Sequence, residues 1–155
     1  MTLREILNSK GRAVHTIGSG ATLEDVVQKL VRNNCGSLIV CDRVADDPAR
    51  DGDPRTSGPM VGIITERDIL KACAMHEAPL GVLRVADVMA TAVVTGSLGD
   101  SVEETMGLMT QKRIRHLPVV EDGQLEGLVS IGDVVKVQYE RLTMENHYLK
   151  SYLNG

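Results

Sequence analysis

The sequence contains no tryptophan and no phenylalanine, and its 3 tyrosines, Tyr139, Tyr148 and Tyr152, all lie near the C-terminus. Single-stranded nucleic acids are bound largely by aromatic side chains on which the bases stack, so this lack argues against such a ligand. The formal net charge of -4 and the pI of about 5.5 argue against a general nucleic-acid binder, whose affinity comes mostly from lysine and arginine. Because large aromatic residues are nearly absent, the core must be aliphatic. Because the net charge is negative, an anionic ligand would need a local basic patch.

Long apolar runs and paired cysteines are also missing. The first residues, MTLREILNSK, lack the apolar stretch of a signal peptide, and no run approaches the roughly 18 residues of a membrane span. The 3 cysteines, Cys35, Cys41 and Cys73, are odd in number and have no CxxC spacing. Such cysteines favour free thiols in a reducing compartment over a disulfide framework. We expect a cytoplasmic protein that does not span a membrane.

Recognisable catalytic patterns are absent as well. The 4 histidines, His15, His76, His116 and His147, are scattered and lack a ligand spacing such as HExxH. Ser130 does not lie in a GxSxG frame. We therefore expect neither an enzyme nor a protein with a resident metal.

What the sequence does contain is a duplication. Residues 21–42 align with residues 100–122 at a nearly constant offset of 79, and GIITERDIL at 62–70 aligns with GLVSIGDVV at 127–135 at an offset of 65. At 155 residues, the chain fits one domain or two small halves that share a core. The change in offset means that the first copy holds a 14-residue insertion.

The insertion falls within residues 43–59, which include three prolines, two glycines and four aspartates. This composition leaves almost nothing to bury, so we expect a solvated and mobile surface loop. The aspartates suggest calcium binding only weakly, because the spacing of an EF-hand and its closing glutamate are missing.

Both copies switch between helical and extended periodicity in the same order. In the first copy, apolar residues at helical spacing predict an amphipathic helix that begins after Thr22; they are Leu23, Val26, Val27, Leu30 and Val31. Two short apolar runs then predict strands, and another helix follows. The pattern predicts an α/β (α+β) fold of two β-α-β-β-α repeats, packed about a pseudo-twofold axis as one module with an extended C-terminal helix.

Neither copy is large enough to bury its apolar face alone, so the two should pack against each other and form two related clefts. We assign residues 1–75 to the first repeat, 76–137 to a linker and the second repeat, and 138–155 to a helical tail. The apolar stripe of the tail fits packing on its own module or on a partner helix.

Each copy carries a threonine or serine followed three residues later by an aspartate, just before its last helix. Thr65 with Asp68, and Ser130 with Asp133, match a capping box, which explains each pair alone but not their duplication. A helix N-terminus also favours an anion such as phosphate. Because a carboxylate repels phosphate but accepts hydrogen bonds from hydroxyls, each aspartate suits a ribose diol, and Thr65 or Ser130 suits the phosphate. Capping and binding are compatible.

A basic segment, KRIRH at residues 112–116, ends a predicted helix directly before a strand. Its first two residues are explained by the helix dipole. Arg115 and His116 lie at the strand entrance and could clamp an anion in a cleft. The first copy has Gly36 and Ser37 there, so its cleft would depend more on Arg67, and the two sites should not be equivalent.

Three features occur together and in order: the paired GxxT/SxxD motifs, VADVM at 85–89 and RIRHLPVV at 113–120. In this combination the sequence resembles a tandem pair of cystathionine-beta-synthase (CBS) domains over nearly its whole length, and is most similar to stand-alone CBS pairs of bacteria and plants. The resemblance implies an adenine ligand between the repeats: AMP, ADP or ATP, or else NAD(H) or S-adenosylmethionine.

The resemblance also implies two sets of site residues. One comprises Asp133, Ser130, Gly132, Arg115 and His116, with His15 and Cys35 beside the base. The other comprises Asp68, Thr65, Arg67 and Ser37, with Val94 and Ile114 from the second repeat. Since the first copy lacks the basic pair, we expect stronger binding at the Asp133 site.

These observations predict a nucleotide-binding regulatory or sensor module that signals to a partner protein. The alternative is an interaction scaffold, for example for a redox partner, whose clefts are weak or vestigial. CBS pairs commonly join through their helices, so we also expect a homodimer.

Overall fold

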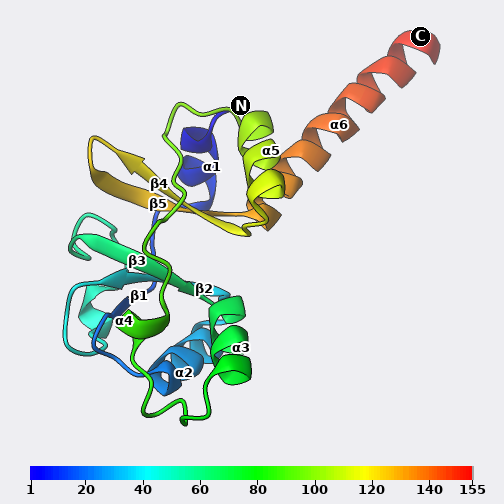
Figure 1. Cartoon of the computed structure of the whole chain (residues 1–155). Helices are drawn as coiled ribbons and strands as arrows, with labels where there is room; N and C mark the ends of the chain where they lie inside the picture. Colours follow the sequence, from blue (N-terminus) through cyan, green and yellow to red (C-terminus); the bar gives the residue numbers. More distant parts are fainter. Residues whose placement is uncertain (155) are drawn as a thin grey trace.

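The computed structural model describes residues 1–154, which form two lobes with a long helix projecting from one of them (Figure 1). The first lobe contains β1 (Thr16–Gly18), β2 (Ser37–Cys41) and β3 (Met60–Thr65), in the order β1-β2-β3. β1 runs parallel to β2, and β3 runs antiparallel to it. Helices α2 (Leu23–Asn33), α3 (Glu66–Met75) and α4 (Val85–Val88) lie on the far side of this sheet from the second lobe (Figure 1).

The second lobe is built on an antiparallel pair of strands, β4 (His116–Glu121) and β5 (Gln124–Ser130). Helices α1 (Leu3–Lys10), α5 (Val102–Lys112) and the start of α6 (Ile131–Asn154) pack with it. Where the first lobe has β1, the second has a single parallel bridge between Gly96 and Val119. Two mixed repeats and an extended C-terminal helix were predicted, and this fold is confirmed.

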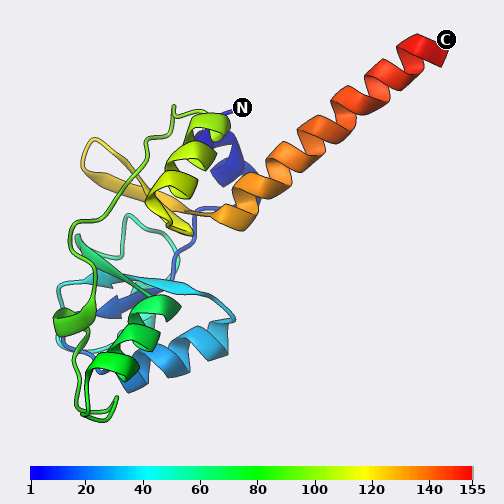
Figure 2. The ribbon, with the colours of Figure 1, turned by 45° about the vertical axis from the view of Figure 1, so that its right-hand side comes forward.

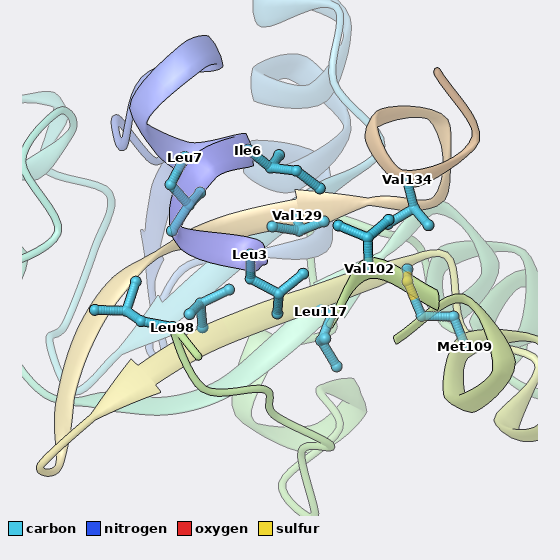
Figure 3. Close-up of a cluster of buried hydrophobic side chains, with 10 residues drawn as sticks. Leu3, Ile6, Leu7, Leu98, Val102, Met109, Leu117, Val129 and Val134 are labelled. Carbon is cyan, nitrogen blue, oxygen red and sulfur yellow. The ribbon is translucent and has the colours of Figure 1, made fainter. Parts of the chain in front are cut away.

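Two short helices are exchanged between the lobes. α1 belongs to the sequence of the first repeat, yet Leu3 and Leu7 are fully buried in the core of the second lobe, with Leu117 and Val129 (Figure 3). α4 belongs to the sequence of the second repeat, yet Val85 is fully buried in the core of the first lobe. Each lobe therefore contains a helix contributed by the sequence of the other repeat.

This exchange explains the glycine that begins each duplicated motif. A Cβ atom on Gly127 would lie 2.9 Å from Leu7 Cδ2, and one on Gly62 would lie 2.7 Å from the carbonyl oxygen of Ala90. In both lobes the strand therefore lacks a side chain where the exchanged segment crosses it closely. A third cluster, which includes Ile39, Ile63 and Leu125, joins the two sheets between the lobes.

The helix starts follow the predicted capping residues. The hydroxyl of Thr22 accepts a hydrogen bond from the Asp25 N–H at 3.1 Å, which caps α2. One detail of the predicted α2 stripe is wrong, because Val31 is 76% exposed while Lys29 is 1% exposed. Lys29 lies one helical turn after the buried Val26, so the face of α2 that turns inward includes a cation.

Lys29 anchors the inserted segment, 43–59, to the first lobe. Its Nζ atom lies 2.7 Å from Asp46 Oδ1 and 3.1 Å from Asp51 Oδ1, and it also donates to the carbonyl oxygen of Thr16. Ser57 is 2% exposed. The segment lies at the surface as predicted, but the expectation that it buries almost nothing is wrong, because two of its aspartates neutralise a buried cation.

Helix α6 leaves the second lobe after its first turns and extends alone away from the body (Figures 1 and 2). From Tyr139 to Asn154 every residue is exposed. Among the described residues, no helix combines the length and apolar character that crossing a bilayer requires.

Candidate functional site

The start of α6 combines a helix cap with an available carboxylate oxygen. Asp133 Oδ2 accepts a hydrogen bond from the Ser130 N–H at 2.8 Å, and Ser130 Oγ accepts one from the Asp133 N–H at 3.1 Å. Within residues 1–154, no hydrogen bond reaches Asp133 Oδ1. The capping prediction is confirmed, and one oxygen remains to accept a hydrogen bond from a ligand.

A lysine that the sequence analysis missed lies beside this carboxylate. Lys10 Nζ is 2.7 Å from Asp133 Oδ2 and also donates to the Leu128 carbonyl oxygen. Burial raises the pKa of Asp133, but the hydrogen bonds from Lys10 and Ser130 outweigh this effect and lower the pKa overall. The exchange of α1 brings Lys10 here from 123 residues away, so no local sequence signal could have indicated the contact.

His116 joins the Asp133 site to the first repeat. It pairs with Ser130 across the β4–β5 ladder, and its imidazole lies so close to Gly36 that a Cβ atom there would be 3.2 Å from His116 Cε1. Glu66 Oε1 would lie 3.4 Å from the same Cβ position. The first copy has Gly36 where the second has the basic residue Arg115. The structure gives a reason, because the absence of a side chain at position 36 leaves room for the imidazole of His116.

The first repeat also contributes the segment around Asp51. His15 Nδ1 lies 3.3 Å from Asp51 Oδ2, and the Thr16 N–H donates to Asp51 Oδ1 at 2.9 Å. Burial raises the pKa of the Cys35 thiol, and the nearby carboxylates of Asp51 and Glu66 raise it further. The thiol is therefore protonated and unreactive at neutral pH. His15 therefore contacts the inserted segment, a contact that the composition of the segment did not predict.

Two residues of the Asp133 set, Arg115 and Gly132, are exposed to solvent. Arg115 is exposed at the entrance of β4, and its carbonyl oxygen accepts a hydrogen bond from the Ile131 N–H at 2.8 Å. Gly132 is exposed in the first turn of α6, next to Asp133. Both therefore lie on the solvent side of the Asp133 site.

The corresponding motif in the first repeat has the same local geometry. Asp68 Oδ2 accepts hydrogen bonds from the N–H and the hydroxyl of Thr65, at 2.9 Å and 3.1 Å. Ser37 is buried and pairs with Thr65 between β2 and β3, while Arg67 is exposed. Val94 and Ile114 pack against the core of the second lobe. Unlike Asp133, Asp68 makes no ion pair with any described residue.

The pKa of His116 depends on its burial and on the charges around it. Burial lowers the pKa of the imidazole, and the positive charges of Arg115 and Lys10 lower it further, although Glu66 and Asp133 act in the opposite direction. The unfolded chain, with the ordinary value of 6.5, therefore takes up this proton at a higher pH than the folded chain does.

We expect the free energy of unfolding to fall as the pH drops below the ordinary value for His116, and to level off below its folded pKa. Urea denaturation at a series of pH values measures the free energy of unfolding. In His116→Gln this free energy should depend less on pH than in the wild type. His147→Gln, on the exposed end of α6, is the control and should follow the wild type. Identical pH profiles for the wild type and His116→Gln would contradict this account.

Comparison with known proteins is consistent with this architecture. The family model of the CBS domain matches residues 3–75 and 85–140. The CBS domain-containing protein CBSX3, mitochondrial, of Arabidopsis thaliana is 30% identical, over 99% of this chain and 72% of its own. The crystal structure of ATU1752 of Agrobacterium tumefaciens, a CBS-domain containing protein, has a TM-score of 0.77 and 33% identity over 89% of this chain and 99% of its own.

A third relative has a solved structure with a ligand. The CBS domain protein PAE2072 of Pyrobaculum aerophilum, complexed with AMP, has a TM-score of 0.66 and 28% identity, over 86% of this chain and 89% of its own. The two matched segments of the family model together include both duplicated motifs and both exchanged helices. The chain therefore belongs to the CBS domain family and carries the domain as a tandem pair.

Proposed function

We propose that the protein is a regulatory module that binds an adenine nucleotide between its two CBS repeats and signals its presence to a partner protein. The observation that carries this proposal is the geometry at Asp133. Its Oδ2 atom holds the cap of α6, while Oδ1 accepts no hydrogen bond from the described residues and can take one from a ribose hydroxyl. His116 lies close enough to Asp133 for the two charges to interact, and its imidazole lies against Gly36 of the first repeat.

The chemistry of the site fits an anionic nucleoside ligand. The N-terminus of α6 supplies the positive end of a helix dipole for the phosphate, and the N–H of the exposed Gly132 lies in its first turn. Lys10 adds a basic side chain at the carboxylate, and His116 and Arg115 lie near enough to interact with each other's charge. Because the chain has no tryptophan or phenylalanine, aliphatic side chains and backbone groups hold the adenine. AMP, which PAE2072 binds, is the first ligand to test.

Asp133→Asn tests the proposal while it keeps the size of the side chain. We expect adenine nucleotides at millimolar concentration to raise the melting temperature of the wild type, because a ligand that binds only the folded state stabilises it. Binding by Asp133→Asn should be weaker by at least about tenfold, since one hydrogen bond to a charged group contributes about 1.5–3 kcal/mol. Isothermal titration calorimetry with AMP, ADP, ATP, NADH and S-adenosylmethionine measures the difference.

Asp68→Asn is the matched control, because it makes the same change at the equivalent position of the other cleft. We expect it to reduce affinity less than Asp133→Asn, since the first motif lacks the adjacent Lys10 and His116. Mass spectrometry of compounds released from the purified protein identifies a ligand that co-purifies. Equal effects of the two variants would contradict the assignment of the stronger site.

One observation favours a scaffold as the second candidate function. Lys10 pairs with Asp133 within the chain, so this carboxylate has a structural role that needs no nucleotide. A protein-interaction scaffold would need no bound nucleotide, and it would show no thermal shift with any adenine compound. That result would exclude the sensor function and favour the scaffold. A cytoplasmic location remains a prediction.

A further inference from the structure

The exposed part of α6 carries a seven-residue repeat that the nucleotide site does not use. Six residues are separated by alternating steps of four and three, and we call them the α6 stripe: Val135, Tyr139, Leu142, Asn146, Leu149 and Leu153. The five apolar members are between 51% and 79% exposed. Alternating steps of this kind are typical of a helix that pairs with another helix along one face.

The stripe lies on a different side of α6 from the residues that hold the helix on its own lobe. Val134 and Val137 pack into the core of the second lobe, and Arg141 forms an ion pair with Glu103 of α5. At 3.6 residues per turn, the stripe lies about a third of a turn round the helix from these residues. The base of α6 is thus fixed, and the exposed stripe continues along the part of the helix that projects from the body. Figures 1 and 2 show this projecting part of the helix.

We propose that α6 pairs with α6 of a second copy of this chain in a parallel, two-stranded coiled coil. In heptad notation Tyr139, Asn146 and Leu153 occupy the a positions, and Val135, Leu142 and Leu149 occupy the d positions. Leucine at d is typical of two-stranded coils. A single asparagine at a favours the parallel, in-register pair, because the two amides then face and hydrogen-bond each other.

The charges beside the stripe also favour a second copy of the chain as the partner and a parallel orientation of the two helices. Glu145 takes position g and Lys150 takes position e of the next heptad, and both are exposed. One carboxylate oxygen of Glu145, Oε1, pairs with Arg141 Nε of its own helix at 3.2 Å, and in the described part of the chain Oε2 is left for a second cation. In a parallel coil, a g residue faces the e residue that follows it by five positions on the other helix. Glu145 of each copy would therefore face Lys150 of the other, which forms two opposite-charge pairs from one sequence. This symmetry is what a homodimer about a twofold axis requires.

Sedimentation equilibrium of the full chain tests the pairing. We expect the wild type to be a dimer at micromolar concentration, and Leu142→Asp combined with Leu149→Asp to raise the dissociation constant by at least about 100-fold, because each leucine loses its apolar burial. Met144→Asp combined with Tyr148→Asp is the control. Both residues are exposed on α6 but lie outside the stripe, so this variant should remain a dimer.

Engineered cysteines test the orientation. In a background that lacks the exposed Cys73, Tyr139→Cys should form a disulfide-linked dimer on oxidation, since equivalent a positions lie side by side in a parallel coil. An antiparallel coil pairs a positions with d positions and would place Tyr139 opposite Leu149, so it would cross-link only mixtures of Tyr139→Cys and Leu149→Cys chains.

Three results would overturn the proposal: a monomeric wild type, a dimer that survives both aspartates in the stripe, or cross-linking only in the mixture. Nucleotide binding is not involved in any of these measurements. A failure of the proposed ligand and a failure of the coiled coil are therefore distinguishable.

Discussion

Lys29→Ala is expected to lower the free energy of unfolding by about 3–5 kcal/mol, the usual cost of removing one partner from a buried ion pair. Lys29 is 1% exposed, and its ammonium group holds Asp46 and Asp51 against the first lobe. Alanine is a better helix former than lysine, so helix propensity in α2 would act in the opposite direction. Urea denaturation followed by circular dichroism measures the loss.

Lys112→Ala is the matched control, because it removes an exposed lysine from α5. Its effect should stay within about 0.5 kcal/mol. A double-mutant cycle with Asp51→Asn separates the pairing of Lys29 and Asp51 from the packing of the lysine stem. If Lys29→Ala cost no more than the control, the cluster would not anchor the inserted segment.

Leu7→Ala is expected to destabilise the second lobe, although Leu7 belongs to the sequence of the first repeat. Leu7 is fully buried, and its Cδ atoms lie against Gly127 of β5. The substitution should lower the free energy of unfolding by about 2–5 kcal/mol, which combines lost apolar transfer with the cavity left behind. Hydrogen exchange measured by NMR should show the larger loss of protection in β4 and β5.

Leu70→Ala provides the comparison, since Leu70 lies on α3 and is 70% exposed. We expect it to change the free energy of unfolding by no more than about 0.5 kcal/mol. Loss of protection confined to β1, β2 and β3 in Leu7→Ala would contradict the exchange of α1 between the lobes.

The candidate site was predictable where neighbours in sequence are also neighbours in space. Thr65 with Asp68, and Ser130 with Asp133, interact over a separation of three residues, so their spacing alone indicated the caps. Lys10 was missed because it reaches Asp133 only through the exchange of α1.

Asp51 was missed for a related reason. The composition of the inserted segment indicated solvent exposure, yet Asp51 is drawn inward by Lys29 and by the Thr16 N–H. Its pKa is lowered because these hydrogen bonds outweigh the effect of burial. A carboxylate of a polar loop becomes partly buried when it pairs with a buried cation. The periodicity of apolar residues does not predict such a tertiary contact.

The sequence by itself determined the duplicated motifs, the order of helices and strands in each copy, the residues that cap the helices and the aliphatic core. These features depend on hydrogen bonds between near neighbours and on the period with which apolar side chains recur. Only the tertiary structure decided that α1 and α4 pack in the opposite lobes, that Lys29 is buried and that Lys10 neutralises Asp133. Those contacts join residues far apart in the chain, and they form because each repeat alone exposes an apolar face that the other can cover.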